Sequence, residues 1–198
     1  MGRQKTYDRE EVVERAMGVF WKAGYHGSST RDLANAMGVN PYSLYAEFGS
    51  KDALYEAAVD RYERLVVTRH FGALETQSSS IKEIRAVLLF FGESAEYQQS
   101  DLGCFLCNTA VELAPSIERS RGIAERYVGR LTEAFANALR NADANGRLVE
   151  DTPIDALASF LTTLLLGIFV QMRARIGGFA LRSSAAQGLA LLDQFIAD

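Results

Sequence analysis

The chain has 198 residues, of which 48% are hydrophobic and 23% are charged, and its formal net charge at pH 7 is −4. These values are typical of a folded protein with a sizeable core, and they exclude a chain that coats nucleic acid indiscriminately. The first 51 residues carry a slight positive balance, whereas the remainder is acidic. A local basic surface near the N-terminus is therefore compatible with the net charge.

The sequence carries no sign of export or of a membrane anchor. Its N-terminus is polar and turns acidic after a few residues, unlike a secretory signal. The longest apolar run, residues 156–170, is shorter than the ~20 residues that a membrane span needs, so we expect a buried helix there. Two cysteines without an export signal argue against a disulfide framework. The expected location is the cytoplasm, with no membrane contact.

The first predicted helix covers residues 8–23, where apolar side chains recur at intervals of three and four. Asp8 is placed to begin this helix and Gly24 to end it. Its expected inner face consists of Val12, Val13, Ala16, Met17, Phe20 and Trp21.

A tight turn joins the next two short helices. Ser29 is placed to cap the first of them, and Asp32, three residues later, completes a capping box. Gly38 supplies the positive φ of the turn, and Asn40 followed by Pro41 begins the next helix. The sequence therefore predicts a helix-turn-helix.

In a helix-turn-helix protein the first residues of the second helix lie nearest the base edges, while the preceding helix crosses the DNA backbone. The candidates for base contacts are therefore Asn40, Pro41, Tyr42 and Ser43. The candidates for phosphate contacts, which set register and salt-dependent affinity, are Thr30, Arg31, Tyr45 and Lys51. Three of these residues also have a simpler structural interpretation. Tyr45 can pack against the core, Ser43 can face solvent, and Thr30 can assist the cap of the preceding helix.

The rest of the chain consists of further predicted helices, with no strand and no repeat. A fourth helix is expected over residues 52–70, with Leu65 and Val66 facing inward, before a loop over residues 71–80. Later helices are expected over residues 81–99, 103–113, 115–144, 152–176 and from Ser184 to the C-terminus. The predicted fold is all-α, with an N-terminal three-helix helix-turn-helix domain (residues 1–51) and a larger helical effector-binding and dimerisation domain (residues 52–198).

The last two predicted helices are apolar on more than one face, so they must be covered on more than one side. Packing within one chain is one solution. Pairing with the same helices of a second copy is the more economical one, and it would form a self-complementary helix bundle. We therefore expect a homodimer through the last two helices.

Residues 24–59 contain a specific series of short motifs: Gly24-Tyr25, Ser28-Ser29, Asp32-Leu33-Ala34, Gly38-Val39, Leu44-Tyr45, Phe48, Ser50-Lys51 and Leu54. Through these residues the segment resembles the TetR family of bacterial transcriptional regulators. The resemblance implies a nine-helix homodimer that binds palindromic double-stranded operator DNA and holds a small-molecule effector in its larger domain. Effector binding in this family usually moves the two helix-turn-helix units apart and releases the DNA.

Cys104 and Cys107 form a Cys-x-x-Cys pair that permits several interpretations. A zinc site would need two more ligands, and the only histidines, His26 and His70, lie in unrelated segments, so no metal and no cofactor are expected. A thioredoxin-like dithiol would need a βαβ setting. A reactive thiol near a helix N-terminus stays open beside the plainer interpretation of two small buried side chains.

Aromatic residues with a few polar neighbours are typical of a small-molecule site, although most such residues belong to a core. The candidate effector-site residues are Phe90, Tyr97, Cys104, Cys107, Asn108, Tyr127 and Phe169. The leading prediction is a ligand-responsive repressor. The alternatives are a thiol-based redox or electrophile sensor acting through Cys104 and Cys107, and a cysteine-dependent enzyme that would lack a nearby histidine or aspartate partner.

Overall fold

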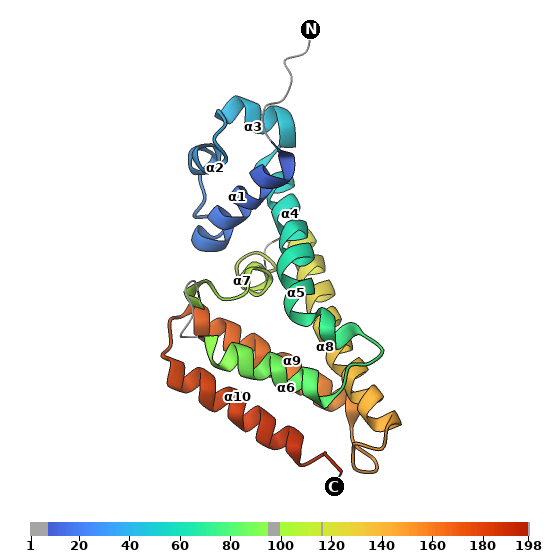
Figure 1. Ribbon diagram of the computed structural model, residues 1–198. Helices are drawn as coiled ribbons and strands as arrows, with labels where there is room; N and C mark the ends of the chain where they lie inside the picture. Colours follow the sequence, from blue (N-terminus) through green and yellow to red (C-terminus); the bar gives the residue numbers. More distant parts are fainter. Residues whose placement is uncertain (1–7, 95–99, 116, 198) are drawn as a thin grey trace.

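The computed structural model describes residues 8–94, 100–115 and 117–197, and most of these residues are helical. They contain no strand beyond an isolated bridge between Leu148 and Ile196, so the all-α prediction is confirmed. The α-helices, shown in Figure 1, are α1 (Arg9–Ala23), α2 (Thr30–Met37), α3 (Pro41–Phe48), α4 (Lys51–Tyr62), α5 (Thr68–Phe71), α6 (Ile81–Gly92), α7 (Phe105–Glu112), α8 (Glu118–Ala144), α9 (Ile154–Arg173) and α10 (Gly178–Asp193).

Helices α1 to α3 form a small unit at one end of the molecule, which we call the N-terminal unit (Figure 1). Its core is made by Phe20, Leu33 and Leu44, one from each helix, and each is at most 1% exposed. The turn between α2 and α3 follows the predicted pattern, because Gly38 adopts the left-handed conformation with φ 70°. Burial of three large apolar side chains fixes the angle between the helices.

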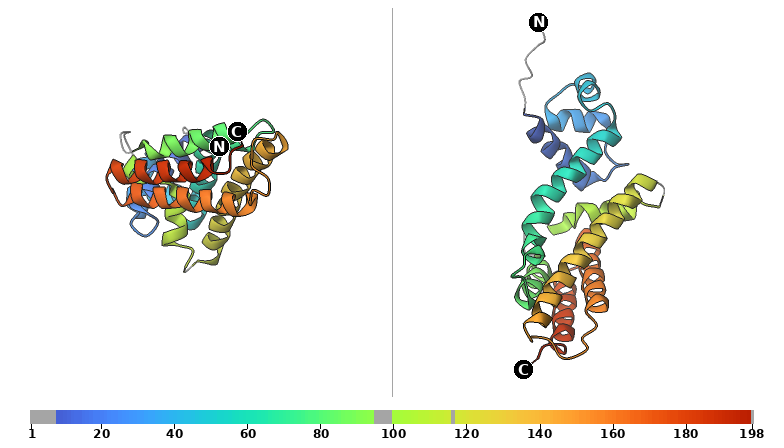
Figure 2. Two further views of the ribbon diagram at one scale, coloured as in Figure 1. Left: turned by 90° about the horizontal axis from the view of Figure 1, so that it is seen from below. Right: turned by 90° about the vertical axis from the view of Figure 1, so that its right-hand side faces the viewer.

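Helix α4 leaves the N-terminal unit and runs into the rest of the molecule, packing against α1 on its way (Figure 2). The division between residues 1–51 and 52–198 stays a prediction, because α4 has contacts on both sides of it. Residues Glu63–Val67 form a π-helical turn between α4 and α5. The sequence pattern predicted uninterrupted α-helix here, with Leu65 and Val66 inward.

That prediction was wrong for Leu65, which is 38% exposed, whereas Val67 is 1% exposed. A π turn bonds residue i to residue i+5 and so adds one residue to the turn. The residue that follows Tyr62 on the buried face is therefore Val67, five positions later. Apolar spacing alone cannot reveal this shift, since Leu65 and Val66 fit the ordinary helical period.

Helices α6 to α10 form the larger part of the molecule, which we call the body. The 27-residue α8 is its longest helix and packs chiefly against α9, while α10 packs against both α6 and α9 (Figures 1 and 2). Within the body, the short α7 lies nearest to the N-terminal unit (Figure 1). It contacts α4 on one side and α8 and α9 on the other.

Three predicted helix boundaries in the body need correction. Helix α6 ends at Gly92, short of residue 99. Helix α8 begins at Glu118, after Pro115. Helix α10 begins at Gly178, directly after its N-cap Gly177, so Ser184 lies within the helix instead of at its start. The two glycines look like a break in sequence, but packing of α10 against α6 and α9 outweighs their low helix propensity.

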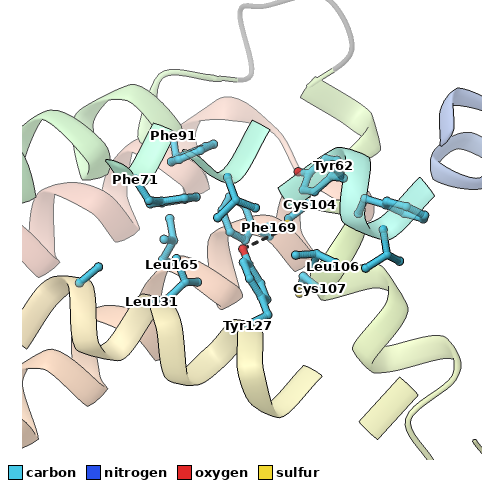
Figure 3. Close-up of a cluster of buried hydrophobic side chains, with 14 of the residues drawn as sticks. Tyr62, Phe71, Phe91, Cys104, Leu106, Cys107, Tyr127, Leu131, Leu165 and Phe169 are labelled. Carbon is cyan, nitrogen blue, oxygen red and sulfur yellow. Dashed lines mark hydrogen bonds between the residues drawn. The ribbon is translucent and has the colours of Figure 1, made fainter. Parts of the chain in front are cut away.

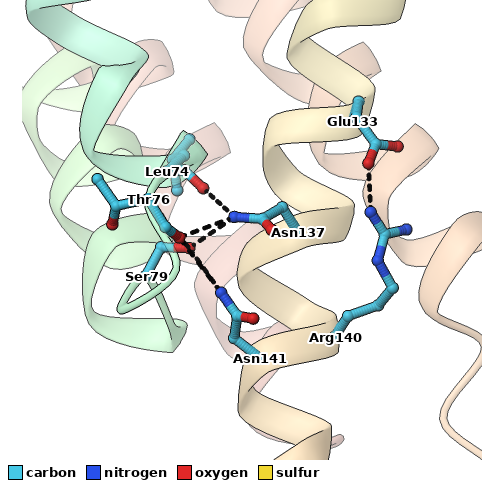
Figure 4. Close-up of polar contacts among 7 residues, drawn as sticks. All are labelled: Leu74, Thr76, Ser79, Glu133, Asn137, Arg140 and Asn141. Atoms are coloured by element: carbon cyan, nitrogen blue, oxygen red, sulfur yellow. Dashed lines mark hydrogen bonds and ion pairs between the residues drawn. The ribbon is translucent and has the colours of Figure 1, made fainter.

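The predicted loop after residue 70 contains one further turn of helix, a 3-10 helix over Gly72–Glu75. The rest of this loop is held against α8 by two asparagines (Figure 4). The Asn137 Nδ2 donates to the carbonyl oxygens of Leu74 and Thr76, at 2.8 and 3.0 Å. Both Asn137 and Asn141 donate to the Ser79 hydroxyl. The loop before α6 is therefore fixed by side chains of α8.

Helices α9 and α10 each have an exposed stripe along the helix that carries no charged side chain. The exposed residues of the α9 stripe are Ala156, Phe160, Thr163, Gly167, Val170 and Ala174, and those of the α10 stripe are Phe179, Ser183, Ala186 and Ala190. Helix α9 is long and apolar enough to cross a membrane by length and composition, and 39% of its most apolar window is buried within the chain. It packs against α6, α8 and α10, as expected of a body helix.

Candidate nucleic-acid interface

Helix α3 presents its first turn outward. Asn40 caps it, and its Oδ1 accepts a hydrogen bond from the Ser43 backbone N–H at 2.7 Å. The next two residues, Pro41 and Tyr42, are exposed, and the Tyr42 side chain reaches 84% exposure. The opposite face is anchored by Leu44 and by Phe48, both buried. The helix thus has one fixed face and one outward polar end.

The start of α2 lies beside α3. The Thr30 hydroxyl is hydrogen-bonded to the Tyr45 hydroxyl at 2.9 Å, which joins the two helices at the surface. Arg31 is exposed. The capping box is present as predicted, and hydrogen bonds from Ser29 hold the pKa of the Asp32 carboxyl below its usual value. The residues predicted to contact bases therefore lie together at the N-terminal end of α3. Three of the residues predicted to contact phosphates, Thr30, Arg31 and Tyr45, lie on α3 or beside it.

Lys51, the fourth predicted phosphate candidate, has partners within the chain. Its Nζ donates to the Tyr25 carbonyl oxygen at 2.6 Å and lies 4.2 Å from the centre of the Tyr25 ring. Lys51 is the first residue of α4, where a cation is disfavoured by the helix dipole, and these two contacts compensate for that. A phosphate contact of Lys51 stays a prediction.

Helix α7 holds the turn between α1 and α2. The Glu112 carboxylate accepts hydrogen bonds from the backbone N–H groups of Tyr25 and His26, at 3.1 and 2.8 Å. The Thr109 hydroxyl, one turn earlier on the same helix, is hydrogen-bonded to the Tyr55 hydroxyl at 2.7 Å. Side chains of one short body helix therefore reach both α4 and the N-terminal unit.

Two further hydrogen bonds join the body to the end of α1. The Trp21 indole N–H donates to the Gly103 carbonyl oxygen at 3.1 Å, directly before Cys104. The Arg173 guanidinium, at the end of α9, donates to the Lys22 carbonyl oxygen at 3.0 Å. A displacement of α7 or of the end of α9 would thus change the hydrogen bonds that hold the end of α1.

The aromatic centre of the body lies next to α7 (Figure 3). Cys104, Tyr127 and Phe169 meet there with Tyr62, and the Cys104 thiol is 3.1 Å from the Tyr127 hydroxyl. All four side chains are buried. Burial raises the pKa of the Tyr62 and Tyr127 hydroxyls well above their usual value, so both are neutral at physiological pH.

Both cysteines are free, buried thiols. Burial raises the pKa of Cys104 above its usual value and that of Cys107 to about 12. A thiol reacts as its thiolate, so raised pKa values oppose the activation expected near a helix N-terminus. This conformation therefore disfavours the thiol-sensor alternative. Among the described residues, no cluster of three or more His, Cys, Asp or Glu is arranged to hold a metal ion.

The other predicted effector-site residues are dispersed. Phe90 lies on the outside of α6, 42% exposed, with its ring 4.9 Å from that of His70. The Asn108 amide donates to the Leu102 carbonyl oxygen at 2.9 Å, so it helps to fix the start of α7. Tyr97 lies outside the described residues. The structure therefore brings together Cys104, Tyr127 and Phe169, with Cys107 close by, but not Phe90.

Sequence profiles of known families match both parts of the chain. The profile of bacterial regulatory proteins of the tetR family matches residues 12–58, and that of the tetracyclin repressor-like C-terminal domain matches residues 80–184. The chain belongs to the TetR family.

Similar proteins of this family cover nearly the whole chain. The HTH-type regulator YezE of Bacillus subtilis is 32% identical over 85% of this chain and 87% of its own, and the repressor ComR of Escherichia coli is 27% identical over 87% and 82%. The structure also resembles a cysteine mutant of the TetR-family regulator CifR complexed with 26-bp operator DNA. That likeness has a TM-score of 0.83 and 30% identity, covering 96% of this chain and 98% of the other. The predicted function, a TetR-type transcriptional regulator, is thereby confirmed.

The caps and the glycine turn located the helix-turn-helix in the sequence, but not the contacts that hold it. Trp21 and Gly103 are 82 positions apart, and Tyr25 and Glu112 are 87 positions apart. Neither pair has a local motif, because hydrogen bonds to backbone groups leave no pattern of side chains in the sequence.

Proposed function

We propose that the protein is a homodimeric repressor that binds a palindromic operator through α3 of each subunit and is released by a small-molecule effector bound in the body. It acts in the cytoplasm, and we assign it no catalytic activity. The observation that carries the proposal is the exposed first turn of α3, where Tyr42 projects from a helix whose other face is locked by Leu44 and Phe48. An exposed aromatic side chain at this position suits a DNA groove better than solvent.

The uncharged outer stripes of α9 and α10 support the dimer. Water-exposed faces of helices normally carry charged residues, and two adjacent faces without them match a partner with the same surface. Pairing of these faces forms a four-helix bundle, as in other two-fold helical dimers. Two N-terminal units on one dimer read two half-sites of a palindrome, because the operator then mirrors the symmetry of the protein.

The position of α7 supports the proposed coupling between effector binding and DNA binding. Its start carries Cys104 in the aromatic centre of the body, and its end carries Glu112 on the turn between α1 and α2. An effector that displaces the side chains around Tyr127 and Phe169 shifts α7. The shift then changes the position of the N-terminal unit relative to its copy in the partner subunit. The effector-site residues named above belong to this proposal.

DNA binding as a function of salt tests the proposed function. An operator is first isolated by selecting bound duplexes from random DNA, and its affinity is then measured by fluorescence anisotropy at increasing salt concentration. We expect a steep linear fall of the logarithm of the affinity with the logarithm of the salt concentration, because phosphate contacts release counterions. Metabolites are next screened for release of the bound operator. A flat salt response, or a selected site without inverted symmetry, would contradict the proposal.

A further inference from the structure

A cleft of about 610 Å³ in the body is bounded by the loop that leads into α6, by the C-terminal end of α8 and by residues close to the C-terminus. Figure 1 shows these segments at the end of the body opposite to α3. This position separates it from the N-terminal unit and from the aromatic centre around Tyr127. Its volume lies within the range typical of small-molecule pockets.

The charged residues that line the cleft are all cationic, although the chain as a whole has a net charge of −4. They are Lys82, Arg85 and Arg147. Arg85 forms an ion pair with Asp193 of α10. The Asp193 carboxylate engages only some of the five N–H donors of the Arg85 guanidinium. Within the described parts of the chain, Lys82 and Arg147 form no ion pair. Among the described residues, two of the three cations that line the cleft are therefore not neutralised by an ion pair.

Both walls of the cleft are held in place. On one side, Asn137 and Asn141 fix the loop of residues 76–80, from which Gln77 and Ser78 line the cleft (Figure 4). On the other side, Arg147 is fixed by the backbone. Its carbonyl oxygen accepts a hydrogen bond from the Ala197 N–H at 3.0 Å, beside the bridge between Leu148 and Ile196. Fixed walls reduce the entropic cost of binding a ligand.

We infer that this cleft binds a small molecule that carries a phosphate group. Phosphate combines high negative charge with several acceptor oxygens, and Arg and Lys bind it by charge-assisted hydrogen bonds. The side chains of Gln77, Ser78 and Asn145 provide neutral donors in the same cleft. The site is distinct from both the DNA-binding end and the effector site proposed above, so it does not depend on the proposed function.

The inference is tested on the purified full-length protein by calorimetric titration with inorganic pyrophosphate at constant ionic strength. The test variant is K82Q/R147Q. The matched control is R121Q/R126Q, which also removes two positive charges, but from exposed positions of α8 outside the cleft. We expect saturable binding to the wild-type protein, affinity at least tenfold lower in K82Q/R147Q, and affinity within twofold of wild type in the control. Thermal unfolding of each variant verifies that it is folded.

Three results would overturn the inference. The first is the absence of saturable binding to the wild-type protein. The second is an affinity of K82Q/R147Q for pyrophosphate that is no lower than that of the control variant, which would mean that binding does not depend on the cleft. The third concerns the chemistry of the ligand. Titration with citrate separates phosphate from carboxylate chemistry. Pyrophosphate is expected to bind more tightly, and a tighter citrate complex would refute the phosphate assignment.

Discussion

The side-chain oxygen of Asn40 is committed to the backbone of α3, where it accepts the Ser43 N–H. Its amide NH2 group stays available to a base, and it can donate to acceptors such as guanine O6, adenine N7 or thymine O4. A single side chain can thus both begin the helix and donate to a base. The neighbouring Tyr42 has no such structural duty, since it is 84% exposed.

Asn40→Asp separates these two roles. Aspartate caps a helix as well as asparagine does, so the free energy of unfolding should stay within about 0.5 kcal/mol of wild type. The substitution removes the NH2 donor and places a negative charge near the DNA phosphates, so operator affinity should fall at least tenfold. Urea unfolding and fluorescence anisotropy measure the two quantities. Unchanged operator affinity would show that Asn40 serves the helix alone.

His70 makes stability depend on pH. It is half-buried beside the rings of Phe90 and Phe91, and burial together with nearby Arg69 lowers its pKa below 6.5. As the pH falls below the ordinary histidine pKa, the unfolded chain takes up a proton that the folded chain still rejects. The free energy of unfolding therefore decreases on acidification.

His70→Gln should reduce this dependence between about pH 7 and pH 5, where histidine titrates. Urea unfolding at several pH values measures it, with His26→Gln at an exposed position as the matched control. The same slope in His70→Gln and in the wild type would rule out His70 as its source.

At the scale of elements, local sequence signals located helix starts near the N-terminus but not the register beyond α4. Asp8, Ser29 and Asn40 each cap a helix through a side chain that bonds within three residues, so the sequence records the cap. The π turn at Glu63–Val67 has no such signature. This turn brings Val67 to the buried face. The packing partners of Val67 lie far away in the sequence, so the local pattern does not indicate the turn.

The turn after α1 is also held by a distant partner. Gly24 has φ 78°, and a Cβ at this position would lie 2.7 Å from Glu112 Oε2. Gly24→Ala should therefore destabilise the fold by about 1–3 kcal/mol, through backbone strain and displacement of the Glu112 carboxylate. Gly18→Ala, inside α1 with open space around its Cβ, is the matched control and should stabilise by roughly 0.5–1 kcal/mol. Urea unfolding distinguishes the two, and equal stability of Gly24→Ala and wild type would contradict the proposed hold on the turn.

At the scale of the whole molecule, the family followed from a short N-terminal motif and the all-α fold from helical patterns along the chain, whereas the connection between the two parts could not be predicted. The motif is local and includes the glycine turn at Gly38, so its residues are adjacent in sequence. The hydrogen bonds between the two parts involve Glu112 and Trp21, whose partners lie more than 80 positions away. The effector likewise stays unidentified, because the aromatic residues of the body serve the core and a cavity equally well.

The dimer makes its own prediction through Phe160, which is 40% exposed on the outer face of α9. Phe160→Glu would bury an unpaired charge between two subunits, so the dimer should dissociate at least tenfold more readily and operator binding should weaken with it. Val111→Glu, an equivalent change at a 68% exposed position on α7, is the matched control. Sedimentation equilibrium measures the association. A Phe160→Glu protein that dimerises like the control would place the interface elsewhere.

The role of α3 is tested most directly by selecting bound sequences from random DNA with three proteins: wild type, Tyr42→Ala and Arg31→Ala. Arg31 is chosen as the phosphate candidate instead of Lys51, because substitution of Lys51 would also remove its contact with Tyr25. We predict an inverted repeat for the wild type. Tyr42→Ala should change the preferred bases at symmetric positions in both half-sites, and Arg31→Ala should lower affinity for every sequence without changing the preference. Unchanged base preference in Tyr42→Ala would contradict the assignment of α3 as the helix that reads the operator.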